Sequence, residues 1–152
     1  MKNQKKATSR AYLWMLLLAI VCAYVSYSNY FANGATIYNK GLLSEPVLQY
    51  ERIGIFVAAG CFILDLIFKK EESFIKTLTR FAKYLVYILF LLSFLQCIVT
   101  EFNFIGNVFV GTDPVEPQYI TNYLITVVTI LGASILALVS ASMQKGQAYR
   151  EE

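Results

Sequence analysis

The chain alternates between long apolar stretches and short polar links. Four stretches, at about residues 11–31, 53–68, 81–100 and 119–143, are almost continuously apolar. Each approaches or exceeds the roughly 20 residues with which a helix crosses a bilayer. Backbone polar groups must be satisfied within such a stretch, so each is expected to be helical. The pattern predicts an all-α, polytopic integral membrane protein with a four-helix transmembrane bundle.

The polar links sharpen the expected helix ends. Ser44, Glu45 and Pro46 suit a helix start, because hydroxyl caps, early acids and first-turn prolines complement free N–H groups. Pro117 opens the fourth helix in the same way. The predicted helices of this single transmembrane domain, residues 1–152, cover about 11–31, 45–70, 81–100 and 117–143.

The second and third links contain apolar residues of their own. In segment 73–83, apolar residues fall on one helical face, and Lys76, Arg80 and Lys83 fall on another. This basic amphipathic segment is expected to lie on the headgroups of an anionic inner leaflet, as an ordinary positive anchor rather than a dedicated lipid sensor. The link from Phe102 to Val110 is expected to be an apolar loop that dips into the interface, covers the bundle or meets a partner.

Basic residues collect on alternate links, which predicts the orientation. The two termini and the middle link carry 11 of the 13 basic residues. The opposite side carries Lys40 and Arg52 against five acidic residues, a net charge of −3. These acids are Glu45, Glu51, Glu101, Asp113 and Glu116. By the positive-inside rule, both termini are expected to be cytoplasmic.

The composition argues against enzymatic and metal-binding functions. The chain has no histidine, and its three cysteines, Cys22, Cys61 and Cys97, lie inside apolar stretches without metal-type spacing. Neither a phosphate-binding loop nor a nucleophile motif is present. We therefore expect no enzyme activity, no cofactor, no metal and no nucleic-acid partner.

Two parts of the chain resemble each other. Asn29 and Asn33 flank an aromatic, an apolar and a small residue, as Asn103 and Asn107 do. Glu-Pro then precedes the second and the fourth apolar stretch in turn. One interpretation is a duplicated helical hairpin whose asparagine segments surround a central axis. The other is chance similarity between apolar segments, and the sequence leaves both open.

Ionisable residues within membrane helices are candidates for function. Asp65 is the candidate ion or proton site, and its pairing with Lys69 at i, i+4 is the favoured structural alternative. Ser93, Gln96 and Thr100 share one helix face. These side chains either line a cavity or form hydrogen bonds to neighbouring helices, and the second interpretation is favoured. With the four asparagines above they form the candidate polar lining.

Small residues recur at spacings of about four in three of the helices, which lets helix backbones approach closely. The candidate packing residues are Ala19, Ala23, Gly54, Ala58, Gly132, Ala133, Ala137 and Ala141. They serve the bundle itself or an oligomer.

Two functions fit these features. The first is a non-enzymatic accessory or scaffold subunit of a larger membrane assembly, bound to a membrane protein partner or to further copies of itself. The alternative is a small transporter or channel for a polar or lipid-like solute. Short loops favour a multi-pass protein of a bacterial plasma (inner) membrane.

Overall fold

The computed structural model describes residues 11–68, 73–111 and 114–148, and the regular structure in these ranges is entirely helical. Five α-helices and one short 3-10 helix follow one another along the chain. They are α2 (Ala11–Asn33), η1 (Ile37–Asn39), α3 (Glu45–Ile67), α4 (Ser73–Thr100), α5 (Phe102–Val110) and α6 (Pro117–Ala148).

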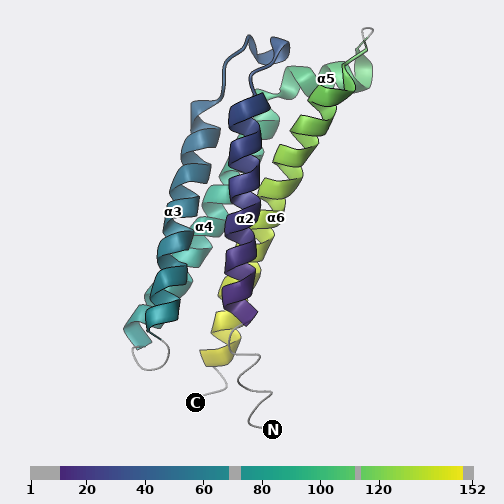
Figure 1. The fold of residues 1–152 in the computed structure, drawn as a ribbon. Coiled ribbons are helices and arrows are strands. Elements are labelled where there is room, and N and C mark those ends of the chain that lie inside the picture. The colour runs from purple at the N-terminus through teal and green to yellow at the C-terminus, as the bar shows by residue number, and fades with distance from the viewer. Residues whose placement is uncertain (1–10, 69–72, 112–113, 149–152) are drawn as a thin grey trace.

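Four long helices, α2, α3, α4 and α6, lie side by side, and the short α5 lies across one end (Figure 1). The beginning of α2 and the end of α6 share the opposite end, which we call the basal end; the other is the α5 end. Helix α2 packs most extensively on α6, and α4 packs on both α3 and α6. The α5 end also holds the loop between α2 and α3 (Figure 1).

Three of the long helices are long and apolar enough to cross a membrane. The candidate spans are Ala11–Asn33, Phe74–Thr100 and Pro117–Gln144. Helix α3 is not among them, and it carries four charged residues, of which Glu51 and Asp65 are buried. The large apolar side chains that α3 exposes include Ile53, Phe56 and Ile67.

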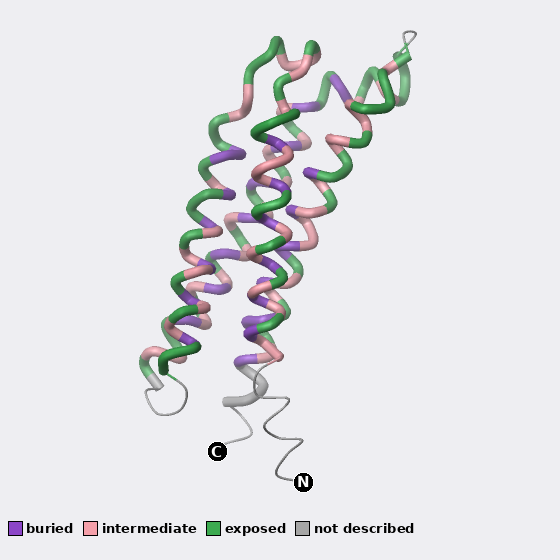
Figure 2. The backbone as a smooth tube through the Cα atoms, viewed as in Figure 1, coloured by how far each residue is buried: buried purple, intermediate pink, exposed green. Residues whose placement is uncertain are grey.

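Buried positions form one stripe along each long helix, facing the other helices (Figure 2). The stripes recur at alternating spacings of three and four residues, the period of left-handed helix packing. In α3 the stripe is Val47, Glu51, Gly54, Ala58, Cys61 and Asp65, and in α4 it is Thr79, Lys83, Val86, Phe90, Ser93 and Cys97. In α6 it is Thr126, Ile130, Ala133, Ala137, Ser140 and Gln144.

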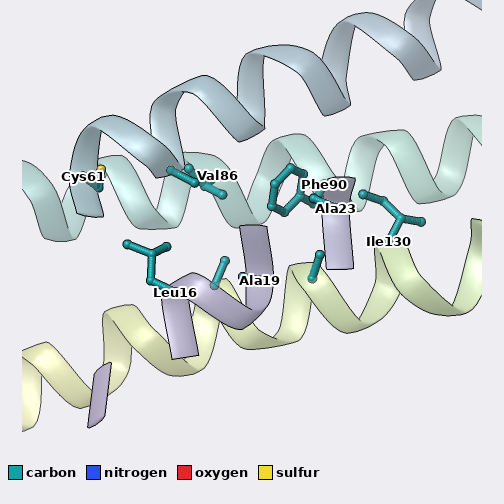
Figure 3. Packing of buried hydrophobic residues seen from close by; sticks show 10 residues of the cluster. Leu16, Ala19, Ala23, Cys61, Val86, Phe90 and Ile130 are labelled. Carbon is teal, nitrogen blue, oxygen red and sulfur yellow. The ribbon is translucent and has the colours of Figure 1, made fainter. Parts of the chain in front are cut away.

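The middle of these stripes is apolar and closely packed. Leu16, Val86, Phe90 and Ile130 fill it between small residues (Figure 3). Polar members of the stripes lie nearer to the two ends, at Glu51 and Ser93 on one side and at Asp65 and Lys83 on the other. The apolar centre therefore separates two buried polar clusters.

Two predictions about the links are wrong. Residues 73–83 are not a separate surface segment, because they are the first turns of α4 and Lys83 is completely buried. Its amine is drawn inward by a carboxylate, and the apolar Phe74 and Phe81 are exposed instead. Residues 102–110 are a helix, not a loop, and Phe104 anchors that helix by its buried ring.

Candidate functional site

Glu51 lies completely buried between α2, α3 and α4. Its Oε1 atom accepts a hydrogen bond from the Ser26 hydroxyl of α2 over 2.8 Å and one from the Ser93 hydroxyl of α4 over 3.1 Å. Its Oε2 atom has no hydrogen-bond partner among the described residues. One oxygen of this buried carboxyl group is thus without a partner in the part of the chain that the structure describes.

The two serines each have a second acceptor within reach. The Ser26 oxygen is 3.1 Å from the carbonyl oxygen of Thr126 on α6, and the Ser93 oxygen is 3.4 Å from that of Val47. A hydroxyl group has one hydrogen to donate. When Glu51 is ionised, both hydrogens can point to Oε1; when Glu51 carries a proton, they can turn to the carbonyls. The cluster therefore accommodates both protonation states.

Glu51 counts in the sequence among the acids of the side opposite the termini, but the structure buries it within α3. Helix α3 begins six residues before Glu51. Glu51 follows Val47 by four residues and precedes Gly54 by three, so its side chain lies on the buried face of the helix. No lysine or arginine in the described part of the chain forms an ion pair with it. An ionised carboxylate without such a partner is expensive to bury, which favours a companion proton or cation.

Asp65 belongs to a second cluster near the basal end. Its Oδ2 atom lies 2.5 Å from the Nζ atom of Lys83, and both side chains are almost fully buried. The predicted partner, Lys69, lies outside the described residues. Asp65 thus pairs across two helices, and its charge is compensated inside the protein.

Lys83 has two further neighbours that fix its position. Its amine donates to Gln144 Oε1 over 2.7 Å and lies 4.5 Å from the centre of the Tyr12 ring. The amide of Gln144 in turn donates to the hydroxyl of Thr79 over 3.1 Å. This cluster joins α2, α3, α4 and α6 through one buried ion pair.

A cavity opens at the α5 end, between α2, α4, α5 and α6. The space for the centres of water molecules is about 20 Å³, enough for one or two waters. Its polar lining residues are Asn29, Asn33, Thr36, Glu101, Asn122 and Thr126. Its aromatic lining residues are Tyr30, Phe104, Tyr119 and Tyr123.

Asn29 connects the cavity to the Glu51 cluster. Its amide donates to the Asn122 carbonyl over 2.7 Å and to the Thr126 hydroxyl over 2.8 Å. The carbonyl of Thr126 is the second acceptor for Ser26, which donates to Glu51. The floor of the cavity is therefore one residue away from the buried carboxyl group.

Glu101 is the carboxylate of the cavity wall. Only 5% of its surface is exposed, and its Oε1 atom accepts a hydrogen bond from Asn39 over 2.8 Å. Burial raises the pKa of Glu101, and the hydrogen bond from Asn39 opposes this shift. Asn39 also donates to the Gly34 carbonyl over 2.6 Å, so the loop with η1 is tied to the site.

The predicted polar lining separates into three groups. Asn29 and Asn33 line the cavity, and Ser93 contacts Glu51. Gln96 and Thr100 lie outside the cavity lining and bond to each other over 3.5 Å.

The two remaining members, Asn103 and Asn107, are exposed on α5. Of the two interpretations of the repeated asparagine segments, the structure does not fit the one that places both around a central axis. Helix α4 ends at Thr100, and the chain turns into a separate helix before Asn103.

The candidate packing residues lie mostly inside the molecule. Ala19, Ala23, Ala58, Ala133, Ala137 and Ala141 are completely buried between the helices. Gly54 faces Phe90 so closely that a Cβ atom would overlap the ring. Gly132 differs, because a Cβ atom there would meet no neighbour within 4 Å.

Sequence reasoning missed Glu51 and Lys83 as members of buried clusters. The available signal was spacing: each lies at an interval of three or four residues from apolar or small residues that are buried. Glu51 lies three residues before Gly54, and Lys83 three before Val86. A stripe of period 3.5 includes both side chains even though each is charged.

The chain was also compared with known proteins. No protein-family model, characterised protein or solved structure matches it significantly.

Proposed function

We propose that this protein is a small membrane carrier in which Glu51 takes up and releases a proton as a polar solute crosses. The observation that carries this proposal is the position of Glu51: completely buried between three helices, without a cationic partner in the described part of the chain. Charged residues inside a membrane protein are costly and commonly mark ion or proton pathways.

The hydrogen bonds around Glu51 support a proton-binding role. Ser26 and Ser93 each have an acceptor on Glu51 and a carbonyl acceptor elsewhere. Gain or loss of the proton therefore requires two hydroxyl rotations and no helix movement at the site. By contrast, the charge of Asp65 is already compensated by Lys83. Asp65 is thus better suited to joining the helices than to exchanging a proton.

An access route from the α5 end also supports a carrier. The cavity reaches Thr126, whose carbonyl lies beside the Ser26 hydroxyl. Ser26 lies seven residues before the end of α2, which is about 10 Å at the helical rise per residue. On the basal side, the apolar core around Leu16 and Phe90 blocks a continuous polar path. This asymmetry is the arrangement of a carrier open towards one side, not of a continuous pore.

The proposal includes α3 as a fourth span, which completes a four-helix transmembrane bundle. Its buried charges face the other helices, and the exposed Phe56 and Ile63 suit lipid. The exposed Arg52 contacts the Tyr27 hydroxyl over 3.3 Å, and its long side chain can extend to the headgroups. The basic termini favour a bacterial plasma membrane with the basal end towards the cytoplasm and its anionic lipid.

Infrared spectroscopy tests the proton site directly. The purified protein in phosphatidylcholine–phosphatidylglycerol vesicles is titrated with acid, and the carbonyl band of a buried carboxyl group is followed. The part of the band that belongs to Glu51 is expected to be lost in Glu51→Gln and kept in Glu45→Gln, which changes an exposed acid on the same helix; the buried Glu101 contributes the remainder. An unchanged band in Glu51→Gln would contradict the proposal.

Flux measurements test transport itself. The same vesicles, loaded with a pH-sensitive dye, receive amines, sugars or amino acids under an inward proton gradient. At least one solute class is expected to move protons with the wild type and with Glu45→Gln but not with Glu51→Gln. Equal proton movement with Glu51→Gln would rule out coupling through this residue.

The accessory-subunit function is the second candidate, and one observation favours it. Helix α5 exposes Phe102, Phe109 and Val110, each by more than 70% of its surface, and exposed apolar patches often meet a partner. The accessory-subunit function is weakened because most of the candidate packing residues are buried inside the molecule and are not free to contact a partner. The mass of the protein extracted from its native membrane in mild detergent decides: a stoichiometric larger partner supports this candidate.

A further inference from the structure

The geometry points to the cavity at the α5 end as a binding site for a small organic ammonium ion. The site combines one carboxylate, that of Glu101, with aromatic walls and carbonyl or amide oxygens. This inference rests on the proposed carrier function, because it names the class of solute that such a carrier would take. Its binding step, however, can be tested without transport.

The charge of the cavity favours a cation. Among the described residues, Glu101 is the one acid that lines the cavity, and no lysine or arginine lines it. Asn39 holds one oxygen of Glu101 through a hydrogen bond of 2.8 Å. The carboxylate is thus held in a fixed position in the wall, and it forms no ion pair with another described residue.

The aromatic walls favour an organic cation. Phe104 and Tyr123 have ring centres 5.3 Å apart, and Tyr38 packs edge-on against Phe104 at 5.2 Å, with the two ring planes at 65°. Tyr38 also supports Tyr119 at 6.3 Å. Ammonium groups are attracted to the faces of such rings, and the alkyl substituents gain apolar contact. The rings therefore form a wall that their mutual packing keeps in place.

A metal ion suits the cavity less well. Hard cations such as Ca²⁺ take six to eight oxygen ligands, and Mg²⁺ takes six. Among the described residues, no group of three or more histidine, cysteine, aspartate or glutamate side chains could hold a metal. One carboxylate with several rings matches an alkylammonium ion better than a bare divalent ion.

Size limits the ligand to a small one. The space for water centres is about 20 Å³, which is one or two waters. An ammonium ion with one or two methyl groups would enter a space of this size with little movement of the rings. Its N–H groups would be donors for Glu101 and for the side-chain oxygens of the asparagines in the wall.

The test is a chemical-shift titration of ¹⁵N-labelled protein in detergent micelles. Dimethylammonium chloride is the probe, with sodium chloride and the neutral analogue 2-propanol as comparisons. Saturable shifts are expected at the side-chain amides of Asn29 and Asn122 with dimethylammonium only. Glu101→Gln is expected to weaken binding at least tenfold, and Phe104→Leu severalfold.

Two matched variants serve as controls. Glu116→Gln removes an exposed carboxylate at the same end, and Phe109→Leu removes an exposed ring of α5; neither residue lines the cavity. Both are expected to bind the probe like the wild type. Absence of saturable binding, equal binding of sodium, or unchanged affinity in Glu101→Gln and Phe104→Leu would overturn the inference. Binding of dimethylammonium without flux would support the ammonium site and reject the carrier function. Proton-coupled flux of another solute without this binding would support the carrier function and reject the ammonium site.

Discussion

Ser26 of α2 donates a hydrogen bond of 2.8 Å to Glu51 of α3, and both side chains are completely buried. The bond joins residues 25 positions apart in the chain. Ser93 of α4 completes the contact from the other side. Three helices thus meet at one carboxyl oxygen, and this contact fixes the position of the proposed proton site.

Removing either serine is expected to destabilise the protein modestly. In Ser26→Ala, Glu51 loses one of its two donors, and hydrogen bonds between membrane helices are worth about 0.6 kcal/mol on average and up to about 1.7 kcal/mol. The free energy of unfolding, measured with increasing SDS in mixed micelles, is expected to fall by that amount. Ser26→Ala combined with Ser93→Ala is expected to cost more than the two single changes together, because the second change leaves the carboxyl without a donor.

Ser28 provides the matched control on the same helix. It is half-buried and makes no hydrogen bond among the described residues. Ser28→Ala is therefore expected to unfold like the wild type. A loss in Ser28→Ala equal to that in Ser26→Ala would show that the contact with Glu51 contributes nothing specific.

The ion pair between Asp65 and Lys83 is expected to be sensitive to removal of one partner. Lys83→Met leaves Asp65 as a buried charge, which costs about 3–5 kcal/mol in comparable cases. Asp65→Asn together with Lys83→Met removes both charges and is expected to recover most of this loss. SDS unfolding of the single and double variants measures it, with the exposed Lys40→Met as control. A double variant as unstable as Lys83→Met would exclude the pair as the cause.

The helical class and three candidate spans follow from apolarity, which the sequence displays directly. The long apolar stretches around Leu16, Phe90 and Ile130 are visible because lipid-facing and core residues are both apolar in such helices. For the same reason, apolarity does not reveal which face is buried. The burial of Glu51 and Lys83 follows from the 3.5-residue spacing of the buried stripes. Their charge, considered by itself, suggests an exposed position instead.

The cavity depended on long-range contacts that no local pattern displays. Glu101 and Asn39 are 62 residues apart, and their hydrogen bond closes the loop of η1 over the site. Asn29 could be proposed as a polar lining residue from the repeated asparagine segments. Its partners on α6, Asn122 and Thr126, follow only from the packing of α2 against α6.

Gly54 is expected to tolerate no side chain. A Cβ atom there would overlap the ring of Phe90, and such overpacking costs typically about 1–3 kcal/mol. Gly54→Ala is therefore expected to lower the free energy of unfolding by that amount, and adding Phe90→Leu is expected to return part of it. Gly60→Ala on the same helix meets no atom within 4 Å and is expected to be neutral or slightly stabilising, because alanine favours helix. Equal losses at both glycines would refute the packing argument.

Glu101 is expected to make stability depend on pH. Burial raises its pKa in the folded protein above the ordinary value of about 4.3. The folded state therefore binds this proton more tightly than the unfolded state. The resulting stabilisation is complete below the ordinary pKa and is lost as pH rises through the raised one. In SDS unfolding, Glu101→Gln is expected to gain stability over the wild type as pH rises from about 4 to 8, whereas Glu116→Gln, at an exposed acid, is expected to follow the wild type. Parallel curves for the wild type and Glu101→Gln would mean that burial does not shift this carboxyl group.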